Sequence, residues 1–250
     1  MKKNLILILI AIILKSFLAN IPIASIAACI LLIIACLNLR KITNNKSYFI
    51  ILIFTIISTC MDLIIGIMSA SSLLINSYDL LSFLSNQYID NDIFADEQFL
   101  SLYSSLFNSI SKILYIAIIP IILWSLILFK LGKALSDLSS NDLLKASLQT
   151  NSKKTAIFTL ISSIIGIAFV IVFFNVFINE IMKLSTQEVF TPTYLIPLVL
   201  ISIFVIMPLL IVFAILLLIF NIKFVVNIFK LIKEAKNNDY INQETINGEL

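Results

Sequence analysis

Residues 53–69 read IFTIISTCMDLIIGIMS, an apolar run that carries one carboxylate, Asp62, near its middle. A helix needs about 20 mostly apolar residues to cross the hydrocarbon of a bilayer. Residues 48–70 supply that length, and the run is too long and continuous for a barrel strand. This stretch therefore predicts a membrane-spanning helix.

Comparable apolar runs flank it on both sides, at residues 5–19, 22–38, 112–130, 155–178 and 194–220. Sixty per cent of the 250 residues are hydrophobic, and the mean hydropathy is +1.10. We therefore predict an all-α, polytopic integral membrane protein, a single membrane domain over residues 1–250 with six transmembrane helices in three hairpins. Lys2 and Lys3 make the first run similar to a signal peptide, but it lacks a clear cleavage site, which favours a retained helix.

Basic residues are distributed unevenly over the connecting segments. Of the 17 Lys and Arg residues, all except Lys15, Lys112 and Lys183 fall on one predicted side of the membrane. Because basic loops stay in the cytoplasm, we expect a bacterial inner-membrane protein with both termini cytoplasmic. The expected cytoplasmic parts are a loop at 131–154 and a basic tail at 221–250, and the expected outside part is an acidic loop at 71–111.

Two of the cytoplasmic stretches have an amphipathic pattern. Leu131, Leu135 and Leu138 share one helical face, Ser140 is the expected N-cap of a following helix, and residues 222–236 alternate lysines with apolar residues at helical spacing. Two interpretations are open: interfacial helices on anionic lipid, or continuations of the neighbouring spans. From Asp96 a similar pattern predicts that the span at 112–130 begins as an amphipathic helix outside the membrane.

Residue types that carry most enzyme chemistry are scarce. The chain has no His and only four dispersed Gly, which excludes Ser-His-Asp and Cys-His catalysis and argues against a phosphate-binding glycine loop. Cys29, Cys36 and Cys60 lie in apolar runs without metal-ligand spacing, so we expect them to be buried. We expect no enzymatic activity, no catalytic residue, no metal, no cofactor and no nucleic-acid partner.

Asp62 and Lys15 lie at compatible depths in the outer half of their predicted spans. An unpaired charge there costs at least about 2.5 kcal/mol, so we expect the two side chains to form an ion pair. In a structural interpretation this pair fixes the packing of the two helices, or Lys15 extends outward to the interface while Asp62 is protonated and bonded to hydroxyls. In a functional interpretation Asp62 is a proton or cation site, with the hydroxyls of Ser58 and Thr59 on the same helical face.

Small residues four apart predict close helix contacts, namely Ala24 with Ala28 and Ser162 with Gly166. Three prolines are expected to bend their spans: Pro120, Pro197 and Pro208.

Two functional hypotheses follow. The first is a non-enzymatic membrane subunit or accessory protein that contacts the lipid bilayer, anionic lipids at the cytoplasmic face and a membrane protein partner. The second is a small permease or channel subunit that uses Asp62 as a proton or cation site.

Overall fold

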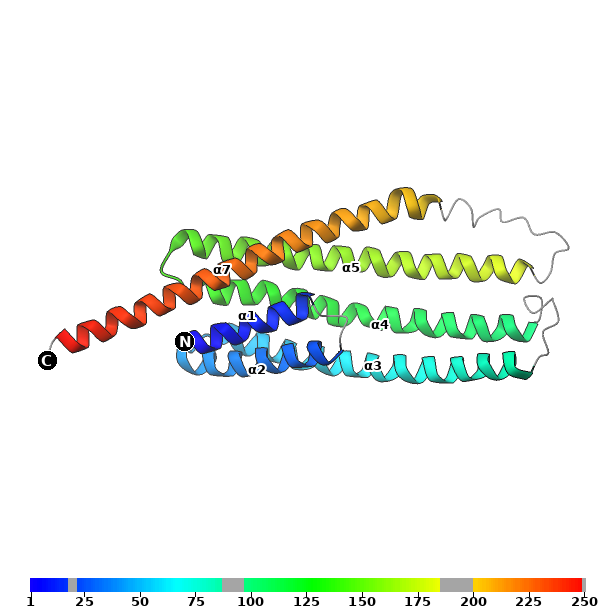
Figure 1. Ribbon diagram of the computed structural model, residues 1–250, viewed down its shortest axis with the longest axis horizontal. Helices are drawn as coiled ribbons and strands as arrows, with labels where there is room; N and C mark the ends of the chain where they lie inside the picture. Colours follow the sequence, from blue (N-terminus) through cyan, green and yellow to red (C-terminus); the bar gives the residue numbers. More distant parts are fainter. Residues whose placement is uncertain (18–21, 87–96, 185–199, 249–250) are drawn as a thin grey trace. The chain divides into compact units, whose positions relative to one another are not determined.

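The computed structural model describes residues 1–17, 22–86, 97–184 and 200–248, and every secondary-structure element in these ranges is helical (Figure 1). The elements are α1 (Lys2–Phe17), α2 (Pro22–Thr43), α3 (Lys46–Asn86), α4 (Glu97–Ser136), α5 (Asp142–Leu184), a π-helical turn η2 (Ser202–Ile206) and α7 (Met207–Gly248). The predicted all-helical class is confirmed.

Five of these helices are long and apolar enough to cross a membrane. They are α2, α3, α4, α5 and α7. The helix α1 has 16 residues, which is below the roughly 17 residues that a span needs at minimum. The chain thus has the helices of a multi-pass membrane protein. The sixth span at 5–19 stays a prediction.

Four helices are much longer than a bilayer requires: α3 has 41 residues, α4 has 40, α5 has 43 and α7 has 42. At 1.5 Å per residue each is about 60 Å long, roughly twice the thickness of the hydrocarbon. Residues 71–86 are therefore helical, although we expected a loop there, whereas helix over 97–111 agrees with the amphipathic start predicted for the span at 112–130. These stretches contain no Pro or Gly to end a helix, and α4 begins at Glu97, one residue from the start predicted at Asp96.

At the opposite end α4, α5 and α7 also continue beyond their apolar runs. This agrees with the second interpretation of the amphipathic stretches, as continuations of the neighbouring spans. The expected loop 131–154 is reduced to residues 137–141, and the expected tail is helical to Gly248. The predicted N-cap at Ser140 is wrong by one residue, because the backbone N–H of Leu144 donates to Oδ1 of Asn141 at 3.1 Å. Ser140 instead donates its backbone N–H and its hydroxyl to the carboxylate of Glu234.

The chain divides into two compact units. Unit 1 comprises Met1–Cys60, Pro120–Ile161 and Ala214–Leu250, and unit 2 comprises Met61–Ile119 and Ser162–Phe213. Among the side chains described in unit 2, the buried hydrophobic residues are Phe107 and Ile171, and the ring centroids of Phe107 and Phe174 are 4.4 Å apart.

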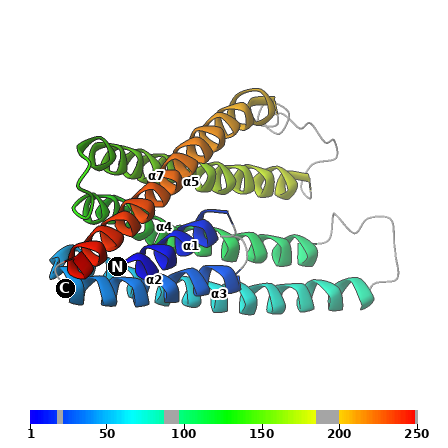
Figure 2. The ribbon, with the colours of Figure 1, turned by 60° about the vertical axis from the view of Figure 1, so that its left-hand side comes forward.

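The main hydrophobic core belongs to unit 1. Leu5, Ile8 and Ile12 of α1 are fully buried, and α1 lies between α2 and the C-terminal part of α7 (Figure 2). Other helices contribute the buried residues Leu32, Leu39, Ile127, Leu128, Leu131, Leu135, Leu148, Phe224, Ile228 and Leu231. The apolar faces of 131–138 and 222–236 are thus largely used within this core.

Local sequence explains how α2 turns into α3. Asn44 has a φ of 51°, a left-handed conformation that Asn tolerates and that ends many helices. Asn45 then caps α3 by accepting the backbone N–H of Ser47 at 2.9 Å. Fully buried Tyr48 donates its hydroxyl to the carbonyl of Ala134 at 3.0 Å, which joins α3 to α4.

The prolines have different surroundings. The π-helical turn η2 ends two residues before Pro208, which lacks an N–H and whose ring conflicts with the carbonyl four residues earlier. In contrast, α4 continues through Pro120. Pro197 lies outside the described residues.

Candidate functional site

Lys15, near the end of α1, is one of the predicted site residues. Its ammonium group donates to Oγ of Ser25 on α2 and lies 5.8 Å from the ring centroid of Trp124 on α4. Ser25 and Trp124 are both buried, and a cation over an indole face is attracted by the ring's quadrupole. Lys15 of α1 therefore contacts both α2 and α4 within unit 1.

Polar contacts continue next to Lys15. Ser16 donates its hydroxyl to Oδ1 of buried Asn221 on α7 at 3.4 Å. On α3, Thr55 and Thr59 donate their hydroxyls to backbone carbonyls one turn earlier, at 2.8 Å and 2.7 Å. The one proton of the Thr59 hydroxyl is therefore used within its own helix.

Among the side chains that the structure describes in unit 1, three hydroxyls are buried without a hydrogen-bond partner: those of Ser58 on α3, Ser125 on α4 and Thr155 on α5. A buried hydroxyl without a partner costs free energy, so such groups are usually satisfied by water or an ion. This feature distinguishes Ser58 from Thr59.

The register of α3 and α4 places two of these hydroxyls at one level. The helices are antiparallel, and Tyr48 contacts Ala134. Ser58 lies ten residues after Tyr48, and Trp124 lies ten residues before Ala134. Ser58 is therefore level with Trp124 and its neighbour Ser125. Because Trp124 lies beside the partly buried Lys15, this register puts Ser58, Ser125 and the Lys15 ammonium group in one polar layer of unit 1.

Asp62 is partly buried and follows Ser58 by one helical turn on α3. The boundary between the two units falls between Cys60 and Met61, so Lys15, Ser58 and Thr59 belong to unit 1 and Asp62 to unit 2. The structure brings Lys15 and Ser58 to one level. The ion pair between Lys15 and Asp62 stays a prediction.

A second polar cluster joins α7 to the α4–α5 connection. The carboxylate of Glu234 accepts hydrogen bonds from the hydroxyl of Ser139 at 2.7 Å, and from the backbone N–H and the hydroxyl of Ser140. Glu234 lies well beyond the apolar run that ends at residue 220. Burial by itself would raise the pKa of Glu234, but these hydrogen bonds, together with one from the backbone of Asn141, lower it below its ordinary value.

The same end of unit 1 contains further side-chain hydrogen bonds between helices. Asn45 donates to a carboxylate oxygen of Asp137 at 3.1 Å, and buried Asn227 of α7 donates to the hydroxyl of Ser147 on α5 at 2.8 Å. Such bonds fix the relative positions of helices that apolar contacts alone leave free to slide.

Burial of the cysteines agrees only in part with expectation. Cys29 and Cys36 are buried and free, as predicted for small hydrophobic residues. Cys60 is exposed, so the prediction was wrong for this residue. On α3 it lies between Thr59 and Met61.

Glycine packing differs from expectation. The predicted close contact at Gly166 is absent, since a Cβ on Gly166 or Gly66 would meet no other atom within 4 Å. Gly132 on α4 is the residue at a close contact, where a Cβ would lie 2.2 Å from the Cβ of Ser152 on α5. No sequence motif identified Gly132, because the second small residue is on another helix.

No protein-family model, no curated protein and no solved structure matches this chain. The structure combines a polar layer able to bind water or a small cation with long helices whose apolar surface is largely uncovered.

Proposed function

We propose that the chain is a non-enzymatic membrane subunit or accessory protein of the bacterial inner membrane, acting through contacts of its helices with partner helices and lipid. The observation that carries this proposal is the low burial of its spans. In the most apolar 18-residue stretch of α5 and of α7 only 6% of the residues are buried, and in the corresponding stretch of α3 17% are buried. Most of the apolar surface of these helices is therefore available to lipid or to other helices.

The contacts within unit 1 support termini on one side of the membrane. Asn38 at the end of α2 donates to Asn4 near the start of α1 at 3.3 Å. The α2–α3 turn contacts the α4–α5 connection through Asn45 and Asp137. That connection in turn contacts Glu234 of α7. The basic segments thus gather at one end, which in our proposal is cytoplasmic, with α1 as the sixth span.

Anionic lipid is the other contact that we propose. On the exposed face of 222–236 the lysines Lys223, Lys230 and Lys233 lie beside exposed Val226 and Phe229. Apolar side chains flanked by lysines suit the interface of an anionic leaflet, even though the opposite face of this segment packs into unit 1.

Site-specific photo-crosslinking tests the proposal. A photoreactive residue at exposed Ile164 of α5 or exposed Ile215 of α7 should yield a defined crosslinked protein of constant mass in native membranes. The same residue at fully buried Leu148 is the control and should yield none. Crosslinks to lipid alone from both exposed positions would contradict the partner-helix part of the proposal.

The second candidate is a small permease or channel subunit with Asp62 as its proton or cation site. The observation that favours it is the pair of unpartnered hydroxyls, Ser58 and Ser125, at the level of Lys15. Hydroxyls of this kind can bind a hydrated cation one helical turn from Asp62 along α3.

A further inference from the structure

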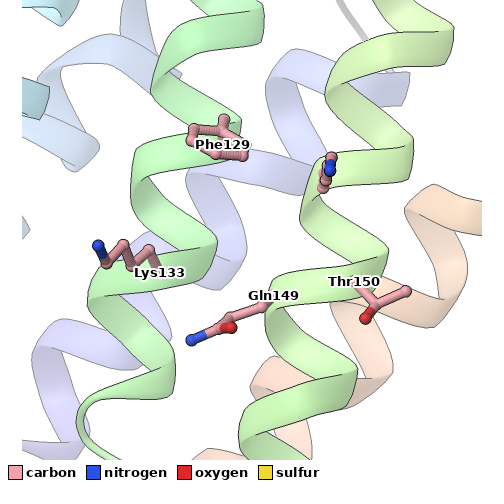
Figure 3. A pocket seen from close by; sticks show the side chains of 5 residues that line it. Phe129, Lys133, Gln149 and Thr150 are labelled. Carbon is pink, nitrogen blue, oxygen red and sulfur yellow. The ribbon is translucent and has the colours of Figure 1, made fainter.

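A cavity of about 290 Å³ opens between α4 and α5 in unit 1. Phe129 and Lys133 of α4 line it together with Gln149, Thr150 and Lys153 of α5. Figure 3 shows these two helices side by side, with the side chain of Gln149 reaching from α5 toward α4. The volume is close to the lower limit of about 300 Å³ for small-molecule pockets, which suits a ligand headgroup.

A close contact between α4 and α5 beside the cavity fixes the backbone positions of its two lysines. Lys133 directly follows Gly132, and Lys153 directly follows Ser152, two residues in close contact between α4 and α5. Gln149 also donates its amide to Oγ of Ser136 on α4 at 2.8 Å. The backbone positions of both lysines are therefore set before any ligand binds.

The charge of the cavity is uncompensated. Lys133 and Lys153 are exposed, and in the ranges that the structure describes neither ammonium group has a carboxylate within ion-pair distance. None of the five lining residues is acidic. Two lysines without a counter-ion that line one cavity favour an anion.

Nearby acidic side chains have other partners. The carboxylate of Asp142 lies 3.4 Å from Nζ of Lys145, and Glu234 accepts hydrogen bonds from Ser139 and Ser140. Each carboxylate would have to lose these interactions before it could pair with Lys133 or Lys153.

The position of the cavity along the helices indicates which anion it suits. Phe129 is near the end of the apolar run 112–130, and Lys153 lies two residues before the apolar run of α5 at 155–178. Phe129, Leu126 and Ile157 expose 42%, 40% and 43% of their surfaces, so apolar surface continues from the cavity toward the hydrocarbon. A phospholipid places its phosphate and its acyl chains in this same order.

We propose that this cavity is a binding site for the phosphate headgroup of an anionic phospholipid. Lys133 and Lys153 bind the phosphate, and Phe129 contacts the upper acyl chain. This inference rests on the lipid contacts of the proposed function and adds to them a specific site that is separate from the exposed face of 222–236.

Binding of short-chain lipids to the purified full chain in a non-ionic detergent tests this site. Dihexanoyl phosphatidylglycerol should bind, while dihexanoyl phosphatidylcholine and inorganic phosphate should bind more weakly. The double variant Lys133→Gln/Lys153→Gln should weaken phosphatidylglycerol binding about 30-fold, since each lysine at an anionic lipid contributes a factor of about five. The variant Lys41→Gln/Lys46→Gln removes the same charge outside the cavity and should bind within about twofold of wild type.

Each outcome decides one part of the inference. Equal loss in both double variants would show attraction by overall charge and overturn the site. Inorganic phosphate binding as tightly as phosphatidylglycerol would overturn the lipid as ligand, and Phe129→Ala should then have no effect. Phosphatidylglycerol binding that depends on the two lysines would support the site even if the crosslinking experiment finds no partner helix, so the two proposals can fail separately.

Discussion

A Cβ atom on Gly132 of α4 would lie 1.7 Å from Oγ of Ser152 on α5 and 3.2 Å from the carbonyl oxygen of Leu148. Only glycine permits this approach of the two helices. The contact lies directly beneath Lys133 and Lys153, so the packing of α4 on α5 and the charged cavity are parts of one local structure.

Gly132→Ala should therefore destabilise the protein by at least about 1–3 kcal/mol, the usual cost of overpacking a close contact. Thermal unfolding in detergent measures the effect. Gly66→Ala and Gly166→Ala are matched controls, since a Cβ there meets no atom within 4 Å. They should be neutral or stabilising by up to about 1 kcal/mol from helix propensity. Adding Ser152→Gly to Gly132→Ala should restore part of the loss, and equal effects of all three glycine changes would contradict the contact.

Glu234 should stabilise the protein in a pH-dependent way. Its pKa is lower in the folded state than in the unfolded chain, so its stabilisation is fully present above the unfolded value of about 4.3 and is lost as pH falls through the folded value. The melting temperature of wild type should exceed that of Glu234→Gln at pH 7, and this difference should shrink as pH falls below about 4.

The control for this titration is Asp142→Asn. The side chain of Asp142 is 96% exposed and its carboxylate pairs with Lys145 at 3.4 Å, so its removal should change the melting temperature little at any pH. A gap between wild type and Glu234→Gln that stays constant from pH 7 to pH 3 would show that the carboxylate charge has no role at the α4–α5 connection.

The proposed orientation predicts opposite labelling of two exposed positions. In a Cys60→Ser background, which removes the exposed native thiol, Asn108→Cys should react with an impermeant thiol reagent applied outside intact cells. Ala146→Cys is also exposed in the structure and should react only after the cells are opened. The reverse pattern would place the basic end outside.

The predicted ion pair of Lys15 and Asp62 is tested by a double-mutant cycle. If the pair is structural, Lys15→Met and Asp62→Asn should each lower the unfolding temperature in detergent, and the double variant should lose less than the sum, because neither charge is then left alone. If Asp62 is a transport site, Asp62→Asn should keep the stability and abolish proton-coupled or cation-coupled uptake into vesicles. Small additive stability losses with normal uptake would exclude both roles.

Apolar runs were sufficient to predict the helical class and to locate five helices able to span a membrane. Helix ends were less predictable, because residues 71–86 are polar enough to resemble a loop and yet lack the Pro or Gly that would end a helix. Gly132 could not be distinguished from Gly166 by its neighbours in sequence. Its importance depends on Ser152, which only the packing of α4 on α5 places opposite it.

The hydrogen-bond partners in the polar layer could not be predicted from the sequence either. Thr59 and Ser58 are adjacent hydroxyls on one predicted face, but Thr59 donates to a carbonyl of its own helix whereas Ser58 is buried without a partner. Whether a hydroxyl has a partner depends on its rotamer and on the neighbouring helix. The composition and periodicity of the sequence determine neither the rotamer nor the neighbouring helix.

The mass of the complex extracted from native membranes tests the central claim most directly. The chain alone has a mass of 28.1 kDa. After mild detergent extraction and purification through a tag on this chain, the proposal predicts a particle whose protein mass, measured by native mass spectrometry, exceeds this value by one or more partner subunits in fixed stoichiometry. A single 28.1 kDa chain with bound lipid only, together with uptake that depends on Asp62, would contradict a subunit role and favour the permease.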